Sequence, residues 1–133
     1  MMLDGHKFKQ INDTYGHDAG DEVIKEMARR LQGCVGQTDT VARLGGDEMG
    51  IILPGIASME AAENVAKQIL RSFEKPLSFN HNEISIGAGI GIALYPDDSV
   101  NKRQLIKCAD QALYKAKESD GSNYKIYNFS GGI

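Results

Sequence analysis

The chain has 133 residues, a formal net charge of −3 and 41% hydrophobic residues, which is enough for one domain with its own hydrophobic core. This charge excludes an overall basic field for holding DNA or RNA, although a few local lysines suffice for a nucleotide. No apolar run is long enough to span a bilayer, and the start has no signal-peptide pattern, so the expected location is the cytoplasm. Cys34 and Cys108 fall in predicted helices, which favours a reducing compartment.

The first third of the chain predicts a strand end, a polar segment and a long helix. Residues 1–3 are typical of the tail of a strand. Residues 4–17 are polar and interrupted by glycine, so they predict a loop or an irregular helical turn. From Asp18, an expected N-cap, apolar residues recur four apart and predict an amphipathic helix that ends near residues 33–36.

The middle of the chain predicts two hairpins separated by a helix. Apolar runs at 41–44 and 49–53 flank a Gly-Gly pair, which indicates a hairpin. Residues 58–74 carry apolar side chains at helical spacing. Runs at 77–79 and 83–94 flank a polar turn and predict a second hairpin.

The end of the chain predicts a helix over residues 102–118 and a closing strand over 124–129. In the preceding run 83–94, isoleucines alternate with glycine and other small residues, so we expect another element to pack closely on one face of that strand. The order of elements predicts an α+β fold, with a central, mostly antiparallel sheet and helices packed around it.

The turn Gly45-Gly46-Asp47-Glu48 is the first candidate site. Taken alone, it has an ordinary explanation as a hairpin turn with a solvated acidic edge. Its functional interpretation is that glycine lets a ligand approach the backbone, while Asp47 and Glu48 supply the hard oxygen ligands that Mg²⁺ prefers. Both interpretations stay open on these residues alone.

The polar segment that follows the first strand is the second candidate. It places Asp4 at a strand end, where ligands gather, and Lys9 with nearby backbone N–H groups could hold phosphates. Asn12 and Asp21 have the donor and acceptor groups that could read a base edge such as guanine. A solvated loop is the alternative. His17 has no second histidine or cysteine near it, which argues against zinc, and His6 is expected at the surface.

Taken together, four separated motifs resemble the GGDEF family of diguanylate cyclases, in order and across nearly the whole chain. They are Asp4-x-x-x-Phe8-Lys9-x-Ile11-Asn12-Asp13-x-Tyr15-Gly16-His17-x-x-Gly20-Asp21, Ala42-Arg43-Leu44-Gly45-Gly46-Asp47-Glu48, Ser85-Ile86-Gly87 and Ala109-Asp110-x-Ala112-Leu113-Tyr114-x-Ala116-Lys117. The resemblance implies a nucleotide-cyclase or palm-like fold over residues 1–133, lacking the family's opening helix and most of its first strand.

The resemblance also implies an activity and a role for each matching residue. Family members join two GTP molecules into cyclic di-GMP and release pyrophosphate, with one GTP on each protomer of a homodimer. The implied cofactor is Mg²⁺ or Mn²⁺, and the implied partners are sensor or phosphodiesterase domains in the same protein. The implied residues are Asp4, the Gly5 carbonyl, Asp47 and Glu48 for the metal; Asp47, Glu48 and Lys9 for catalysis; and Asn12, His17, Asp21, Gly45, Gly46 and Lys117 for substrate.

Four departures bear on activity. The motif ends in Met49 instead of phenylalanine, and the Arg-x-x-Asp inhibition site before it keeps Asp39 without the arginine. The family's Gly-Arg-Asn appears as Gly-Ser-Asn at residues 121–123, and His6 stands where a second aspartate is common. An active cyclase is therefore the leading hypothesis. A catalytically weak GTP-binding module that regulates an adjacent domain, such as a cyclic di-GMP phosphodiesterase, is the alternative, and a purely structural dimerisation domain is the third.

Overall fold

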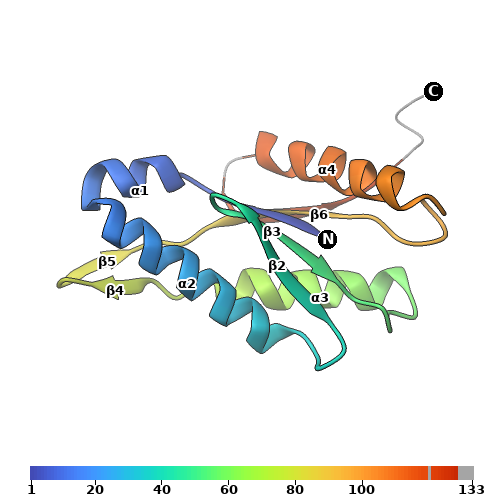
Figure 1. Cartoon of the computed structure of the whole chain (residues 1–133), viewed down its shortest axis with the longest axis horizontal. Helices are drawn as coiled ribbons and strands as arrows, with labels where there is room; N and C mark the ends of the chain where they lie inside the picture. Colours follow the sequence, from blue (N-terminus) through green and yellow to red (C-terminus); the bar gives the residue numbers. More distant parts are fainter. Residues whose placement is uncertain (120, 129–133) are drawn as a thin grey trace.

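The computed structural model describes residues 1–119 and 121–128, which form one five-stranded sheet, a separate two-stranded hairpin and four helices. The large sheet has the strand order β2-β3-β1-β6-β7, with β1 in its centre (Figure 1). The elements are β1 (Met2–Gly5), α1 (Phe8–Tyr15), α2 (His17–Cys34), β2 (Thr40–Gly45), β3 (Glu48–Ile52), α3 (Met59–Ser72), β4 (Leu77–Phe79), β5 (Asn82–Ile84), β6 (Ala88–Ile92), α4 (Lys102–Glu118) and β7 (Asn123–Ile126).

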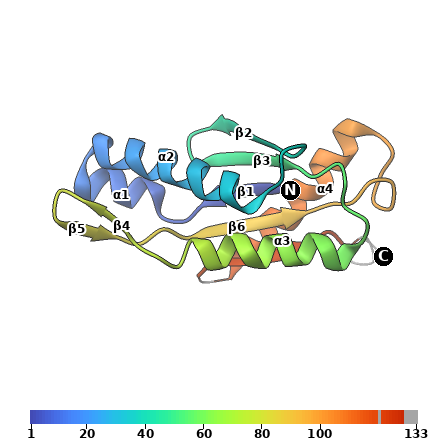
Figure 2. The same cartoon turned by 90° about the horizontal axis from the view of Figure 1, so that it is seen from below.

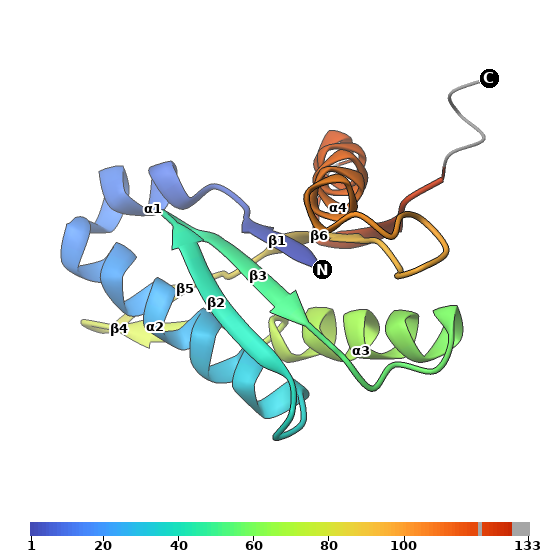
Figure 3. The ribbon, with the colours of Figure 1, turned by 45° about the vertical axis from the view of Figure 1, so that its right-hand side comes forward.

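The helices cover the two faces of the sheet unequally. Helix α4 lies on one face, over β6, while α2 and α3 lie on the other face, as Figures 2 and 3 show. The pairs β2–β3, β3–β1 and β1–β6 are antiparallel, and β6–β7 is parallel because α4 crosses over between them. The predicted α+β class with a mostly antiparallel sheet is confirmed.

Register decides which side chains meet each helix layer. Leu3 lies opposite both Met49 and Ile90, and all three are buried in the main core beneath α2 and α3. One residue earlier, Met2 lies opposite Gly91 on the face that α4 covers. Because side chains alternate along a strand, Asp4 points to the same face as Met2, towards α4.

The alternating glycines of β6 explain how closely α4 approaches. A β-carbon on Gly91 would lie 2.1 Å from the Ala109 carbonyl oxygen and 2.3 Å from the Leu113 nitrogen, so backbone meets backbone there. The intervening Ile90 and Ile92 are buried on the opposite face. The predicted close packing on one face of this strand is therefore confirmed.

Three expectations about elements need correction. Residues 4–17 are not mainly a loop, because α1 occupies Phe8–Tyr15 and buries Ile11. The run 83–94 is not one strand: β5 pairs with β4, whereas β6 leaves that hairpin and pairs with β1. Asp18 lies inside the first turn of α2, and Gly16 precedes that helix. Within the predicted closing strand, Phe129 lies outside the described residues.

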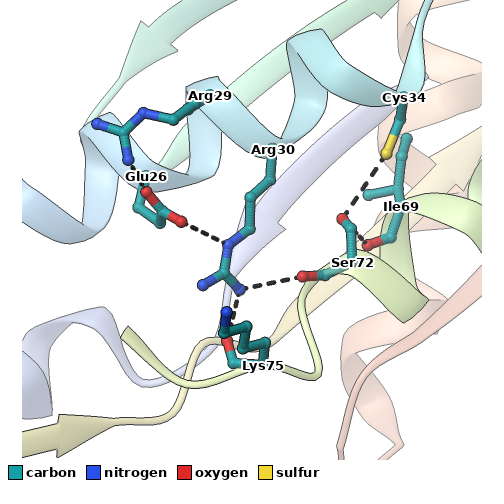
Figure 4. A network of polar contacts seen from close by, with 7 residues as sticks. All are labelled: Glu26, Arg29, Arg30, Cys34, Ile69, Ser72 and Lys75. Carbon is teal, nitrogen blue, oxygen red and sulfur yellow. Dashed lines mark hydrogen bonds and ion pairs between the residues drawn. The ribbon is translucent and has the colours of Figure 1, made fainter. Parts of the chain in front are cut away.

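A polar network fixes α2 to the end of α3 (Figure 4). The Arg30 guanidinium donates to the Glu26 carboxylate within α2 and to the carbonyl oxygens of Ser72 and Lys75, at 3.1 and 2.6 Å. These bonds satisfy carbonyl groups at a helix C-terminus, which an isolated helix leaves unpaired. Across the described ranges 1–119 and 121–128, no helix has the length and apolarity needed to cross a bilayer.

Candidate active site

The β2–β3 turn brings Asp47 onto the end of β1. Gly46 has a φ of 54°, a backbone conformation that side-chain-bearing residues rarely adopt, and the Arg43 Nε donates to the Gly46 carbonyl at 2.9 Å. On the β1 side, the Gly5 N–H donates to the Asp47 carbonyl at 3.2 Å. A β-carbon on Gly5 would lie 2.9 Å from Asp47 Oδ2, so the carboxylate rests directly on the glycine.

Asp4 and Asp47 form a pair of facing carboxyl groups. Burial and, after it, the neighbouring Asp4 carboxyl together raise the pKa of Asp47 from 3.8 to about 6, while the Lys117 charge acts in the opposite direction. Glu48 lies opposite Asp4 in the β1–β3 register, which adds a third acidic residue at the same end of these strands. Two neighbouring carboxylates repel each other, and either a proton or a bound cation relieves that repulsion.

Lys117 reaches this pair from the last turn of α4. Its Nζ lies 2.5 Å from Asp4 Oδ2, with the two side chains 38% and 20% exposed. Gly89 leaves room for this approach, because a β-carbon there would lie 3.1 Å from Lys117 Cγ. The small-residue pattern of β6 thus serves the site as well as the helix packing.

The donor set fits a hard divalent cation. The carboxylates of Asp4 at the end of β1 and Asp47 in the β2–β3 turn match Mg²⁺, which takes one or two carboxylates and completes its octahedron with water and phosphate oxygens. In residues 1–119 and 121–128 no group of three or more His, Cys, Asp or Glu side chains is arranged to enclose a metal by itself. Because its donors are carboxylate oxygens, the site suits an ion that brings water or phosphate oxygens as further ligands.

The expected base-reading residues lie on the α1–α2 corner, which follows directly from β1. A β-carbon on Gly20 would lie 1.8 Å from Asn12 Oδ1, so the Asn12 amide sits against the glycine that precedes Asp21. The Gly16 N–H donates to the Asn12 carbonyl at 2.9 Å, which turns the chain sharply between the helices. Asp21 and His17 are exposed on the first turns of α2.

The structure thus joins some predicted residues directly and leaves others apart. Gly5 lies against Asp47, Lys117 is paired with Asp4, and Glu48 lies opposite Asp4 in the strand register. Lys9 lies exposed in the first turn of α1. The substrate roles of Lys9 and His17 stay predictions.

His6 is not at the surface as expected. It is half-buried, and its ring Nε2 is buried without a hydrogen-bond partner among the described residues. The backbone N–H of His6 donates to the Gly87 carbonyl at 2.9 Å. Burial lowers the pKa of His6, and the nearby Lys117 charge lowers it further. Ser122, in the place of the family's arginine, accepts a hydrogen bond from the Ala88 N–H at 3.1 Å. The only sequence signal for either residue was its departure from the motif.

The retained aspartate of the Arg-x-x-Asp stretch has a local structural role. Asp39 Oδ2 accepts a hydrogen bond from the Gly36 N–H at 2.7 Å, and the Asp39 N–H donates to the Gly36 carbonyl at 3.2 Å. The two bonds close a tight turn between α2 and β2. Without an arginine at position 36, this turn offers no guanidinium to a ligand.

Fold and site together define a nucleotide-cyclase type of domain: an α+β sheet whose hairpin turn sets a carboxyl pair beside a lysine. The family model described as "Diguanylate cyclase, GGDEF domain" matches residues 1–123. The chain therefore belongs to the GGDEF family.

Two curated relatives illustrate the match. The diguanylate cyclase TpbB of Pseudomonas aeruginosa is 40% identical over 118 residues, which are 88% of this chain and 27% of TpbB. The bifunctional diguanylate cyclase/cyclic di-GMP phosphodiesterase MucR of the same species is 38% identical over 130 residues, 98% of this chain and 18% of MucR. The chain thus spans less than a third of the length of these relatives.

The fold agrees with a solved family member. A structure of the TpbB GGDEF domain from Pseudomonas aeruginosa superposes with a TM-score of 0.95 at 36% sequence identity, covering 98% of this chain and 77% of that one.

Proposed function

We propose that this domain is a diguanylate cyclase that condenses two GTP molecules into cyclic di-GMP and pyrophosphate. The observation that carries the proposal is the facing pair Asp4–Asp47, held at the turn of the GGDE motif and contacted by Lys117. A pair of carboxylates with one lysine is suited to a nucleoside triphosphate accompanied by a divalent cation. The GGDEF relatives named as diguanylate cyclases support the same reaction for this chain.

In this proposal Asp4, Asp47 and the Gly5 carbonyl would hold Mg²⁺ or Mn²⁺, with Glu48 supporting them. When bound, the cation would neutralise negative charge on the triphosphate. Lys9 and Lys117 would contact the phosphates and stabilise the charge that develops there during attack. Asn12, His17 and Asp21 would hold the guanine and ribose end, at the α1–α2 corner.

The 3′-hydroxyl of one GTP would attack the α-phosphorus of the other and expel pyrophosphate, with the hydroxyl proton passing to Asp47. Two such bonds close the ring, so two copies of the domain must face each other in a homodimer. GTP is therefore both the nucleophile and the electrophile.

The alternative is a GTP-binding module of low activity that regulates an adjacent domain, such as a phosphodiesterase. Met49 in the motif and Ser122 in place of arginine favour it, and MucR combines both activities in one protein. The two proposals differ in turnover and agree in binding.

The test is incubation at high protein concentration with GTP and Mg²⁺, with cyclic di-GMP detected by mass and GTP binding measured by calorimetry. Product that disappears in Asp47→Ala supports the cyclase. Binding that weakens in Asp47→Ala without product from either protein, in a dimerised form as well, supports the regulatory module. A protein that neither binds GTP nor forms product would contradict both proposals.

A further inference from the structure

Asp4 forms an ion pair with a positively charged side chain of the same chain, Lys117. The Lys117 ammonium lies 2.5 Å from Asp4 Oδ2, and the residues are 113 positions apart in the sequence. The other ion pairs in the described ranges lie within α2, between residues three or four apart. The fold, and not local helix geometry, therefore brings Lys117 to this carboxylate.

The residues around Lys117 hold its side chain near Asp4. Its Cγ lies over Gly89, and Ala116 beside it is fully buried against the sheet, so the last turn of α4 is fixed in position. Gly89 in turn lies opposite Asp4 in the β1–β6 register. A β-carbon on this glycine would lie 3.1 Å from Lys117 Cγ, so a side chain there would crowd the lysine stem.

We propose that Lys117 acts as the internal cation of the metal-free site and competes with a divalent cation for Asp4, so that the site takes up the metal as its complex with a nucleoside triphosphate. The inference rests on the proposed function, because it takes Asp4 and Asp47 as the metal-binding carboxylates. It adds the order of events: the triphosphate offers Lys117 another anion, and only then does Asp4 become available.

The competition follows from simple electrostatics. A divalent cation on Asp4 would stand close to the ammonium, and like charges at such distances repel. A metal ion without nucleotide must therefore break the ion pair or use Asp47 alone. A metal–triphosphate complex brings negative charge with it, and the lysine can move from the carboxylate to the phosphates without losing a partner.

The test measures binding of Mn²⁺ alone, by electron paramagnetic resonance, and of Mn²⁺ with a non-hydrolysable GTP analogue. We expect Lys117→Gln to bind Mn²⁺ alone about fivefold more tightly than the original protein, which is the upper end of what the loss of a partly exposed ion pair allows. The same variant should bind the Mn²⁺–analogue complex about tenfold more weakly, because it loses a phosphate contact.

Two matched controls separate competition from general charge. Lys115→Gln removes one positive charge from the same exposed turn of α4, and Lys117→Arg keeps the charge at the site. Both should bind Mn²⁺ alone within about twofold of the original protein, because the cation at Asp4 remains. Lys117→Met, which removes the charge and keeps the stem, should repeat the glutamine result, and circular dichroism confirms that each variant is folded.

Equal Mn²⁺ affinity in Lys117→Gln, Lys117→Met and Lys115→Gln would overturn the inference. Mn²⁺ binding by Asp47→Asn then tests whether the metal site of the proposed function is also wrong. If Asp47→Asn weakens Mn²⁺ binding while the Lys117 variants change nothing, the metal site stands and the competition is wrong. If Asp47→Asn leaves Mn²⁺ binding unchanged, the metal site itself is wrong.

Discussion

Asp47 rests on Gly5: a β-carbon at position 5 would lie 2.9 Å from Asp47 Oδ2 and 3.4 Å from Asp47 Cβ. The contact joins the end of β1 to the β2–β3 turn, two segments that are more than forty residues apart. The position of the candidate catalytic carboxylate thus depends on the absence of a side chain on the neighbouring strand.

Gly5→Ala should therefore displace Asp47. We expect a loss of stability of about 1–2 kcal/mol and a loss of at least about tenfold in metal–GTP affinity, because an added methyl group forces the carboxylate to move. Urea unfolding and calorimetry measure the two effects. Gly33→Ala is the control, since a β-carbon there meets nothing within 4 Å and should stabilise α2 by about 0.5–1 kcal/mol. Unchanged nucleotide affinity in Gly5→Ala would contradict the close contact.

The raised pKa of Asp47 predicts how stability depends on pH in the absence of metal. The folded pKa is about 6 and the ordinary value is 3.8, so the folded state holds a proton that the unfolded state releases. This group's contribution to stability is complete below about pH 4 and is lost as pH rises through 6. Asp47→Asn removes that loss, and at pH 8 it should be more stable than the original protein by about 1–2 kcal/mol, after allowance for solvent screening.

Urea unfolding with a chelator at pH 4 and pH 8 checks this prediction. The advantage of Asp47→Asn should be present at pH 8 and small at pH 4, and saturating Mg²⁺ with GTP should reverse it, because the variant lacks a ligand. Asp39→Asn is a suitable control, since Asp39 accepts a bond from the Gly36 N–H, away from the carboxyl pair. An Asp47→Asn protein that is less stable than the original protein at pH 8 without metal would show that the charge of Asp47 does not destabilise the folded state.

Met49 is a core residue as well as the last residue of the motif. It is 1% exposed and lies opposite Leu3 in the sheet. Met49→Leu conserves volume and should cost less than about 1.5 kcal/mol, whereas Met49→Ala should cost about 2–5 kcal/mol through the cavity it leaves. Thermal unfolding measures both. If Met49→Leu abolishes GTP binding while its stability is kept, the residue has a role beyond packing.

Local patterns predicted three of the four helices and the first hairpin with little error, for reasons visible in the structure. Helices α3 and α4 have both an apolar stripe and capping residues: the Ser58 Oγ accepts from the Ala61 N–H at 3.1 Å, and the Asn101 Oδ1 accepts from the Gln104 N–H at 3.0 Å. Helix α1 was missed because in eight residues it buries only Ile11, which is too short a pattern to detect.

The candidate site was predictable in its residue types and only partly in its contacts. The motif and the resemblance supplied Asp4, Asp47 and Lys117, but their contacts depend on strand register and on the glycines that face α4. The half-buried position of His6 was not predictable, because it depends on the hydrogen bond to Gly87, more than eighty residues away. Non-local pairing of this kind leaves no periodic trace in a sequence.

A substitution at Gly20 tests the proposed guanine site at the α1–α2 corner separately from the carboxyl pair. A β-carbon there would lie 1.8 Å from Asn12 Oδ1, a distance that no real contact allows, so Gly20→Ala must push the Asn12 amide aside or separate α1 from α2. We expect guanine discrimination to fall about tenfold or more, measured as the ratio of GTP to ATP affinity, because a misplaced amide leaves base-edge groups unpaired. Mn²⁺ binding without nucleotide should be unchanged. Asn12→Ala should reproduce the loss of discrimination, and a GTP preference retained in both variants would place the guanine elsewhere.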